Sequence, residues 1–196
     1  MNWKTLLVIG VIAFGGYQHW QKRTVAYGPG VVATQEPTQH NPNNNNTISK
    51  NGYQLTPLQD FRIEARVLST EHYRMDRESD LAPVDLALGW GRMSDEAILS
   101  TIKISQSNRF YFWHVDAFPI PREEIETHSA NMHMIPADSL VEKTLKSVRV
   151  GQVVSVSGYL VEARAADGWH WKSSLTRNDT GNGACELVLV KAISVR

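Results

Sequence analysis

The chain has 196 residues, 42% of them hydrophobic, which suits one ordinary domain with a buried core and excludes two large ones. Twenty basic and twenty acidic residues cancel overall. The first 50 residues hold five charged side chains: Lys4, Lys22, Arg23, Lys50 and Glu36. The rest of the chain is therefore weakly acidic, which disfavours binding to nucleic acid. The single cysteine, Cys185, excludes an intramolecular disulfide and a CxxC metal knuckle.

An apolar run lies near the N-terminus. Residues 5–17, TLLVIGVIAFGGY, carry no charge, and Trp3 and Trp20 flank them. On a helix these tryptophans would be roughly 26 Å apart, close to the thickness of a membrane's hydrocarbon core. We predict that residues 1–23 form a transmembrane anchor, in preference to a cleaved signal segment or a buried helix. The chain is expected to cross the membrane once, with the globular domain outside the cytoplasm.

Residues 24–52 have the composition of a flexible linker, with three prolines, an asparagine tract and few large apolar groups. Within this segment, YGPGVVA (residues 27–33) is apolar enough to pack back on the body of the protein. A single globular domain is expected over residues 53–196.

From residue 53 onward, apolar residues recur mostly at every second position, the period of a β-strand. Strands are predicted over residues 61–69, 101–106, 109–116, 150–165, 168–177 and 184–195. The second and third of these form a hairpin through Ser107 and Asn108, and the fourth and fifth form another. The last has apolar residues on both faces, which implies a central or doubly covered position. Helices are predicted over residues 95–102, capped by Ser94, and over 138–148.

This pattern predicts a β-rich α+β domain with one or two helices behind an N-terminal membrane helix. A small, partly open β-barrel of the oligonucleotide/oligosaccharide-binding type is a candidate architecture. The stretches DLALGWGRMSD, HSANMHMIPA and DGWHWKSSLTRNDTGNGACE also resemble an uncharacterised family of small bacterial proteins with an N-terminal apolar segment. The resemblance covers most of residues 53–190. It implies a bacterial origin and one compact domain, and no activity. With the predicted anchor, the expected location is a bacterial inner membrane, crossed once, with the globular domain in the periplasm.

The stretch SANMHMI, residues 129–135, contains a serine, an asparagine and a histidine, residue types that are typical of active sites. In an extended conformation Ser129, Asn131 and His133 share one face, and Met132 and Met134 share the other. We interpret this segment as structural, with the methionines in the core and His133 on the wetter face. A catalytic serine–histidine pair is disfavoured, because the two side chains would be roughly 13 Å apart.

A metal-dependent hydrolase is the alternative function. His114 and Asp116 share one face of their predicted strand, where the carboxylate can orient the imidazole. If that strand lay beside residues 129–133, then His114, Asp116, Asn131 and His133 would converge on a divalent metal. The preferred interpretation of His114 is an exposed strand residue, so no metal and no cofactor are assigned.

Two tryptophans provide candidates for ligand binding. Trp169 and Trp171 share one face of their strand, where they either pack in the core or stack on a ligand. Together with Arg177 and Asp179 in the turn-rich segment that follows, they form a candidate ligand-binding set. The predicted function is therefore a membrane-tethered binding or scaffolding domain, with a protein or glycan as its partner.

Overall fold

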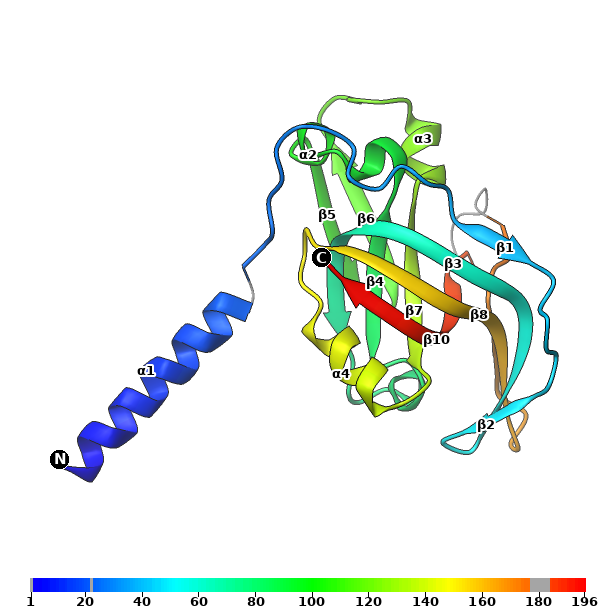
Figure 1. Cartoon of the computed structure of the whole chain (residues 1–196), viewed down its shortest axis with the longest axis horizontal. Helices are drawn as coiled ribbons and strands as arrows, with labels where there is room; N and C mark the ends of the chain where they lie inside the picture. The colour runs from blue at the N-terminus through cyan, green and yellow to red at the C-terminus, as the bar shows by residue number, and fades with distance from the viewer. Residues whose placement is uncertain (1, 22, 177–183) are drawn as a thin grey trace.

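A computed structural model describes residues 2–21, 23–176 and 184–196 (Figure 1). Its elements, in chain order, are α1 (Trp3–Gln21), β1 (Thr38–His40), β2 (Ile48–Lys50), β3 (Tyr53–His72), the 3-10 helix η1 (Arg77–Asp80), β4 (Val84–Gly89), the 3-10 helix η2 (Gly91–Ser94), α2 (Glu96–Leu99), β5 (Ile102–Ser107), β6 (Phe110–Val115), α3 (Arg122–Thr127), β7 (Ser129–Pro136), α4 (Ser139–Ser147), β8 (Val153–Ala165), β9 (His170–Lys172) and β10 (Glu186–Val195).

Five strands close into a ring. In the order β3, β4, β7, β10 and β8, each strand pairs with the next, and β8 pairs again with β3. The pairing of β7 with β10 is parallel and the others are antiparallel. The predicted central position of the last strand is confirmed, since β10 lies between β7 and β8. The ring, with its few helices, confirms the prediction of a β-rich α+β domain.

One long strand makes the closure possible. The first part of β3, from Tyr53 to Arg66, pairs with β8, and the second part, to His72, pairs with β4. The register shifts between Val67 and Ser69, so that two consecutive apolar residues are buried on opposite sides of the sheet. Val67 enters the core inside the ring, and Leu68 enters a second core outside it. A bulge of this kind bends a strand, as closing a ring requires.

The core inside the ring is built from alternate residues of its strands. Both methionines of β7, Met132 and Met134, are fully buried there, as their alternation predicts. The other large members are Phe61, Ile63, Val67, Leu86, Leu88, Trp90, Leu145 and Leu160. The helix α4 contributes Leu145 and is capped by Asp138, whose carboxylate accepts hydrogen bonds from the main-chain N–H groups of Leu140 and Val141 at 2.9 Å.

The hairpin β5–β6 forms a second layer over the outer face of β4 and β7 (Figure 1). It turns at Asn108 and Arg109, whose φ angles of 51° and 69° are those of a tight two-residue turn. Its inner face, with Tyr111, Trp113 and Val115, packs against Ala87 and its neighbours. The hairpin was predicted, although its turn lies one residue later than expected.

The membrane prediction is wrong. Within the described residues, no helix is long and apolar enough to cross a membrane. The apolar run covers thirteen residues, and α1 continues beyond it over Gln18, His19 and Gln21, which lower its average hydropathy. The predicted single-pass anchor and the inner-membrane, periplasmic location are therefore overturned.

The segment between residues 23 and 52 lies against the body rather than apart from it. The N–H of Val25 donates to the carbonyl of Val150 at 2.8 Å, where Gly151 (φ 88°) leaves no room for a side chain because an added Cβ would lie 1.8 Å from the Val25 carbonyl. Ala33 is fully buried, and β1 and β2 both pair with β3. The packing expected of residues 27–33 is therefore observed, and the mobility of residues 24–52 stays a prediction.

The first predicted helix differs from expectation. α2 has four residues instead of eight, and its N-cap is Asp95, which accepts from the N–H of Ala97 at 2.9 Å. Ser94 instead accepts hydrogen bonds from the main-chain N–H groups of Val32 and Ala33, at 3.2 and 3.1 Å. A serine beside an aspartate is thus used to fix the N-terminal segment, which the local sequence does not indicate.

Candidate ligand-binding site

A buried histidine lies on the outer face of β7. His133 is 3% exposed and is paired across the strands with Asp85 of β4, which is fully buried. Nδ1 of His133 is 2.9 Å from Oδ2 of Asp85, but the two atoms lack hydrogen-bond geometry, so they are in close contact without a hydrogen bond. The imidazole also packs against the indole of Trp171, with ring centroids 4.6 Å apart. The expectation of a wetter face at His133 is therefore wrong.

Arg109, at the tip of the β5–β6 hairpin, completes this polar cluster. Its guanidinium donates to both carboxylate oxygens of Asp76 and to Oδ1 of Asp85, each at 2.9 Å. It lies over the ring of Tyr73, 3.7 Å from the centroid, and the Arg109 main-chain N–H donates to the Tyr73 hydroxyl. These contacts hold Arg109 in a left-handed conformation that is costly for a non-glycine residue. They fasten the hairpin tip to the loop between β3 and β4.

The electrostatics of this cluster suit a structural role. Burial acts to raise the pKa of Asp76, but hydrogen bonds and charge from Arg109, with hydrogen bonds from Ser79, hold that pKa below its ordinary 3.8. Burial raises the pKa of Tyr73 above its ordinary value. At neutral pH the carboxylate is therefore charged and the phenol neutral, as an ion pair and a cation–π contact require.

The proposed metal ligands are divided between two places. His114 and Asp116 lie together, with Nε2 and Oδ1 3.4 Å apart, on the outer face of the hairpin, where their side chains are 69% and 85% exposed. His133 and Asn131 lie beneath the hairpin and are buried. In the described part of the chain, no three histidine, cysteine, aspartate or glutamate side chains gather as metal ligands.

Other side chains of the protein pack on the two tryptophans that were predicted to form a ligand platform. Trp169 and Trp171 are half-buried and pack against the core cluster that contains Leu55 and Leu187. The guanidinium of Arg77 lies 4.9 Å from the ring centroid of Trp169, and that of Arg109 lies 5.9 Å from Trp171. Arg177 and Asp179 lie outside the described residues.

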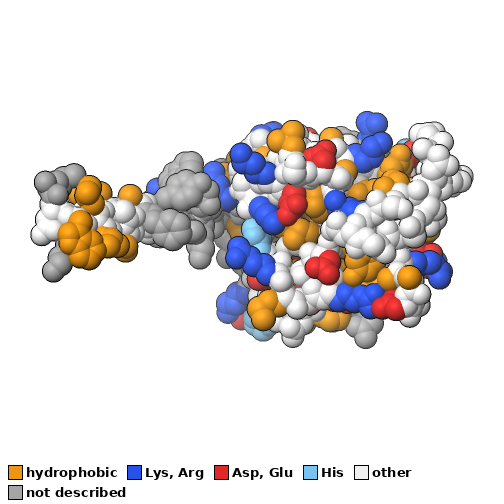
Figure 2. Space-filling view, turned by 90° about the horizontal axis from the view of Figure 1, so that it is seen from below, with side chains coloured by type: hydrophobic (Ala, Val, Ile, Leu, Met, Phe, Trp, Pro, Cys, Tyr) orange, Lys and Arg blue, Asp and Glu red, His pale blue; other side chains and the backbone are white. Residues whose placement is uncertain are grey.

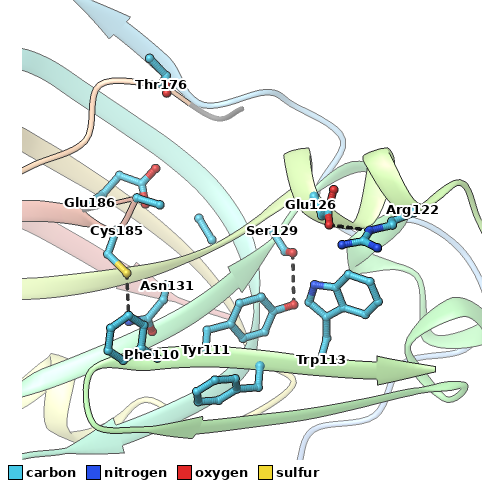
Figure 3. A pocket seen from close by; sticks show the side chains of 13 residues that line it. Phe110, Tyr111, Trp113, Arg122, Glu126, Ser129, Asn131, Thr176, Cys185 and Glu186 are labelled. Atoms are coloured by element: carbon cyan, nitrogen blue, oxygen red, sulfur yellow. Dashed lines mark hydrogen bonds and ion pairs between the residues drawn. The ribbon is translucent and has the colours of Figure 1, made fainter. Parts of the chain in front are cut away.

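A pocket of about 420 Å³ lies beside β6 (Figure 3). We call it the β6 pocket. One side is formed by Phe110, Tyr111, Phe112 and Trp113 of β6, and the floor by residues 129–131 of β7. Arg122 and Glu126 of α3 close one end, and Thr176 with residues 184–186 closes the other. The pocket thus joins three neighbouring segments, β6, α3 and β7, to Thr176 and residues 184–186, which come much later in the chain.

The polar groups on the pocket floor are already hydrogen-bonded. The Ser129 hydroxyl donates to the carbonyl of Ile125 at 2.6 Å and lies 3.2 Å from the Tyr111 hydroxyl. The Asn131 amide donates to the carbonyl of Arg109 at 2.9 Å and accepts from Gln106 at 2.6 Å. Their geometry is therefore fixed before a ligand enters.

The chemistry of the pocket favours binding over catalysis. Burial raises the pKa of Tyr111 to about 12, against a smaller opposing effect of the hydrogen bond with Ser129. A neutral phenol at that pKa is a poor general base at neutral pH. Arg122 and Glu126 are paired, with Nε and Oε1 2.8 Å apart. No histidine is among the described lining residues, and the Ser129 hydroxyl donates to the main-chain carbonyl of Ile125.

Sequence reasoning missed this pocket. The signal was RFYFW at residues 109–113, five residues that contain four aromatics, which was interpreted only as a strand that precedes His114.

Comparisons with protein-family models, curated proteins and solved structures find no match. The resemblance to small bacterial proteins stays a prediction, and a function is inferred from the site alone.

Proposed function

We propose that this chain is a binding module whose ligand occupies the β6 pocket. The observation that carries the proposal is the aromatic side of the pocket, Phe110–Trp113, beside a floor of pre-oriented polar side chains. A concave site with apolar walls and a few fixed polar groups is typical of ligand pockets, and its volume lies within their usual range of about 300 to 1,000 Å³.

We further propose that the ring is a small barrel of the oligonucleotide/oligosaccharide-binding type. The strand order supports it: the first strand of the ring pairs with the second and fourth, and the third pairs in parallel with the fifth. The helix α4 lies between the third and fourth strands, β7 and β8. Such folds bind ligands on the face of their second and third strands and with the loop between the fourth and fifth.

The position of the β6 pocket agrees with this proposal. Its floor is the outer face of β7, the third strand of the ring, and one end belongs to the connection between β8 and β10. The hairpin β5–β6 is inserted between the second and third strands and packs on the face that would otherwise bind a polymer. The pocket lies on that face between β6, α3 and the start of β10.

The charge of the site favours a neutral or weakly basic ligand with apolar groups. Its charged lining residues are Arg122, Glu126 and Glu186. On the face seen in Figure 2, basic and acidic side chains are interspersed with apolar ones. The described lining of the pocket holds one basic side chain and two acidic ones, which disfavours a phosphate backbone as its ligand.

The proposal is tested by a ligand-observed NMR screen with small aromatic and aliphatic fragments. We expect fragments that bind the parent protein and lose at least tenfold in affinity in Phe112→Ala. Leu140→Ala is the control, because Leu140 is an exposed apolar residue of α4 (72%) and does not line the pocket. A screen without binders, or one whose binders respond equally to both substitutions, would overturn the proposal.

A further inference from the structure

The β6 pocket lies against the edge of a strand. Four consecutive residues, Phe110–Trp113, line it. Consecutive side chains of a strand point to opposite faces, so a pocket that lay on one face would contact only alternate residues. Phe110 and Phe112 belong to the exposed outer face of β6, and Tyr111 and Trp113 to the inner face. A pocket that contacts both faces in turn must face the main chain between them.

That edge of β6 has no partner strand in the described part of the chain. β6 pairs only with β5, in a sheet of two strands. The main chain of residues 110–115 makes no hydrogen bond outside this pairing among the residues that the structure describes. In an antiparallel pair, every second residue directs its N–H and C=O away from the partner. These groups of β6 therefore point toward the pocket.

We infer that the β6 pocket takes an extended peptide, which adds as a third strand to the free edge of β6. This inference rests on the function proposed above and names the class of its ligand. A row of main-chain donors and acceptors is complemented along its length only by another main chain, as in β-strand addition. The exposed rings of Phe110 and Phe112, 38% and 52% exposed, would then pack beside alternate peptide side chains as cross-strand neighbours.

The dimensions favour a short peptide over a second copy of this chain. Four strand residues span roughly 13 Å, which limits the paired segment to about four residues. α3 closes the edge at Arg122 and Glu126, and residues 184–186 close it at the other end. A second copy that paired only along these four residues would bury an area well below the roughly 1,200 Å² of a stable protein–protein interface. The peptide is expected to be apolar at alternate positions. The walls of the pocket are aromatic, and the charged side chains at one of its ends, Arg122 and Glu126, are paired with one another.

The test uses an array of acetylated and amidated hexapeptides with threonine at odd positions and valine, isoleucine, leucine, phenylalanine or tyrosine at even positions. Each binder is then made in two further forms, with N-methyl groups on the amides of the odd or of the even residues. A strand has two edges, so each form blocks the donors of one edge only. We expect one form to lose tenfold or more in affinity and the other to lose much less, with slowed hydrogen exchange at those amides of residues 110–113 that point away from β5.

The methylated peptides leave the protein unaltered, so misfolding cannot produce this result. Equal affinity of both methylated forms would overturn the inference, because side chains alone would then hold the peptide. Fragments that bind while every peptide of the array fails would overturn it and leave the proposed binding function intact. If neither binds, both fail. A dimer in sedimentation that already protects the amides of β6 would overturn it in favour of a second copy.

Discussion

Asp85 and His133 face one another across β4 and β7, with Oδ2 and Nδ1 2.9 Å apart and both side chains buried. Arg109 binds the other oxygen of Asp85. Asp85 is thus the shared partner of a histidine from the ring and an arginine from the hairpin. The carboxylate connects the two layers of the protein at the point where the hairpin turns.

Replacement of Asp85 by alanine should destabilise the fold by about 3 to 5 kcal/mol, because it leaves the buried charge of Arg109 without one of its two carboxylates. Asp85→Asn should cost less, since the amide oxygen still accepts from Arg109. Urea unfolding measures both. Asp116→Asn serves as the control, with an expected change within roughly 0.5 kcal/mol at an exposed site. If Asp85→Ala proves as mild as Asp116→Asn, Asp85 does not join the layers.

The local pattern of the sequence was sufficient to predict most of the strands. Alternation placed Met132 and Met134 in the core and paired β5 with β6, because side chains on successive residues must face opposite ways. The same alternation put His133 on the opposite face, but it could not show that this face is buried as well. Burial of His133 depends on Trp171 of β9, which packs on its ring from nearly 40 residues later in the chain.

The candidate site was beyond local reasoning for the same reason. Trp169 and Trp171 were chosen for their spacing, but Arg77 and Arg109, which lie over them, come from a distant loop and from the hairpin tip. The β6 pocket needs β6, α3, β7 and the start of β10 together. The parallel pairing of β7 with β10 joins residues more than 50 positions apart, which no short-range pattern specifies.

The low pKa of Asp76 should make part of the free energy of unfolding decrease at acidic pH. A carboxyl whose folded pKa is depressed contributes stability above its unfolded pKa and loses it as the pH falls through the folded value. The free-energy difference between the parent and Asp76→Asn should therefore be constant above about pH 5 and shrink below 3.8. Urea unfolding at a series of pH values measures it. A difference that does not change with pH would show that the ion pair with Arg109 contributes no pH-dependent stability.

Zinc should not stabilise this protein. His114 is exposed on the outer face of the hairpin, whereas His133 is buried beside Asp85. One metal ion therefore cannot be coordinated by both side chains. We expect the melting temperatures of the parent, His114→Ala and His133→Ala to be unaffected by zinc at concentrations well above those of the protein. A zinc-dependent rise in the parent that is absent in both variants would restore the hydrolase alternative.

Tyr111 should make the protein sensitive to alkali. Its folded pKa is about 12, above the ordinary 10.0, because burial disfavours the phenolate. A group whose pKa is raised by folding contributes stability that is complete below its unfolded pKa and is lost as the pH rises through the folded value. The parent should therefore lose stability between pH 10 and about 12 relative to Tyr111→Phe, whose ring does not titrate. Denaturant unfolding across this range gives the difference, and Tyr27→Phe, on a side chain outside the pocket, is the control. Parallel alkaline curves for the parent and Tyr111→Phe would mean that the phenol is solvated in solution. The inner side of the β6 pocket would then be open to water at Ser129, and the closed floor on which the binding proposal rests would have to be abandoned.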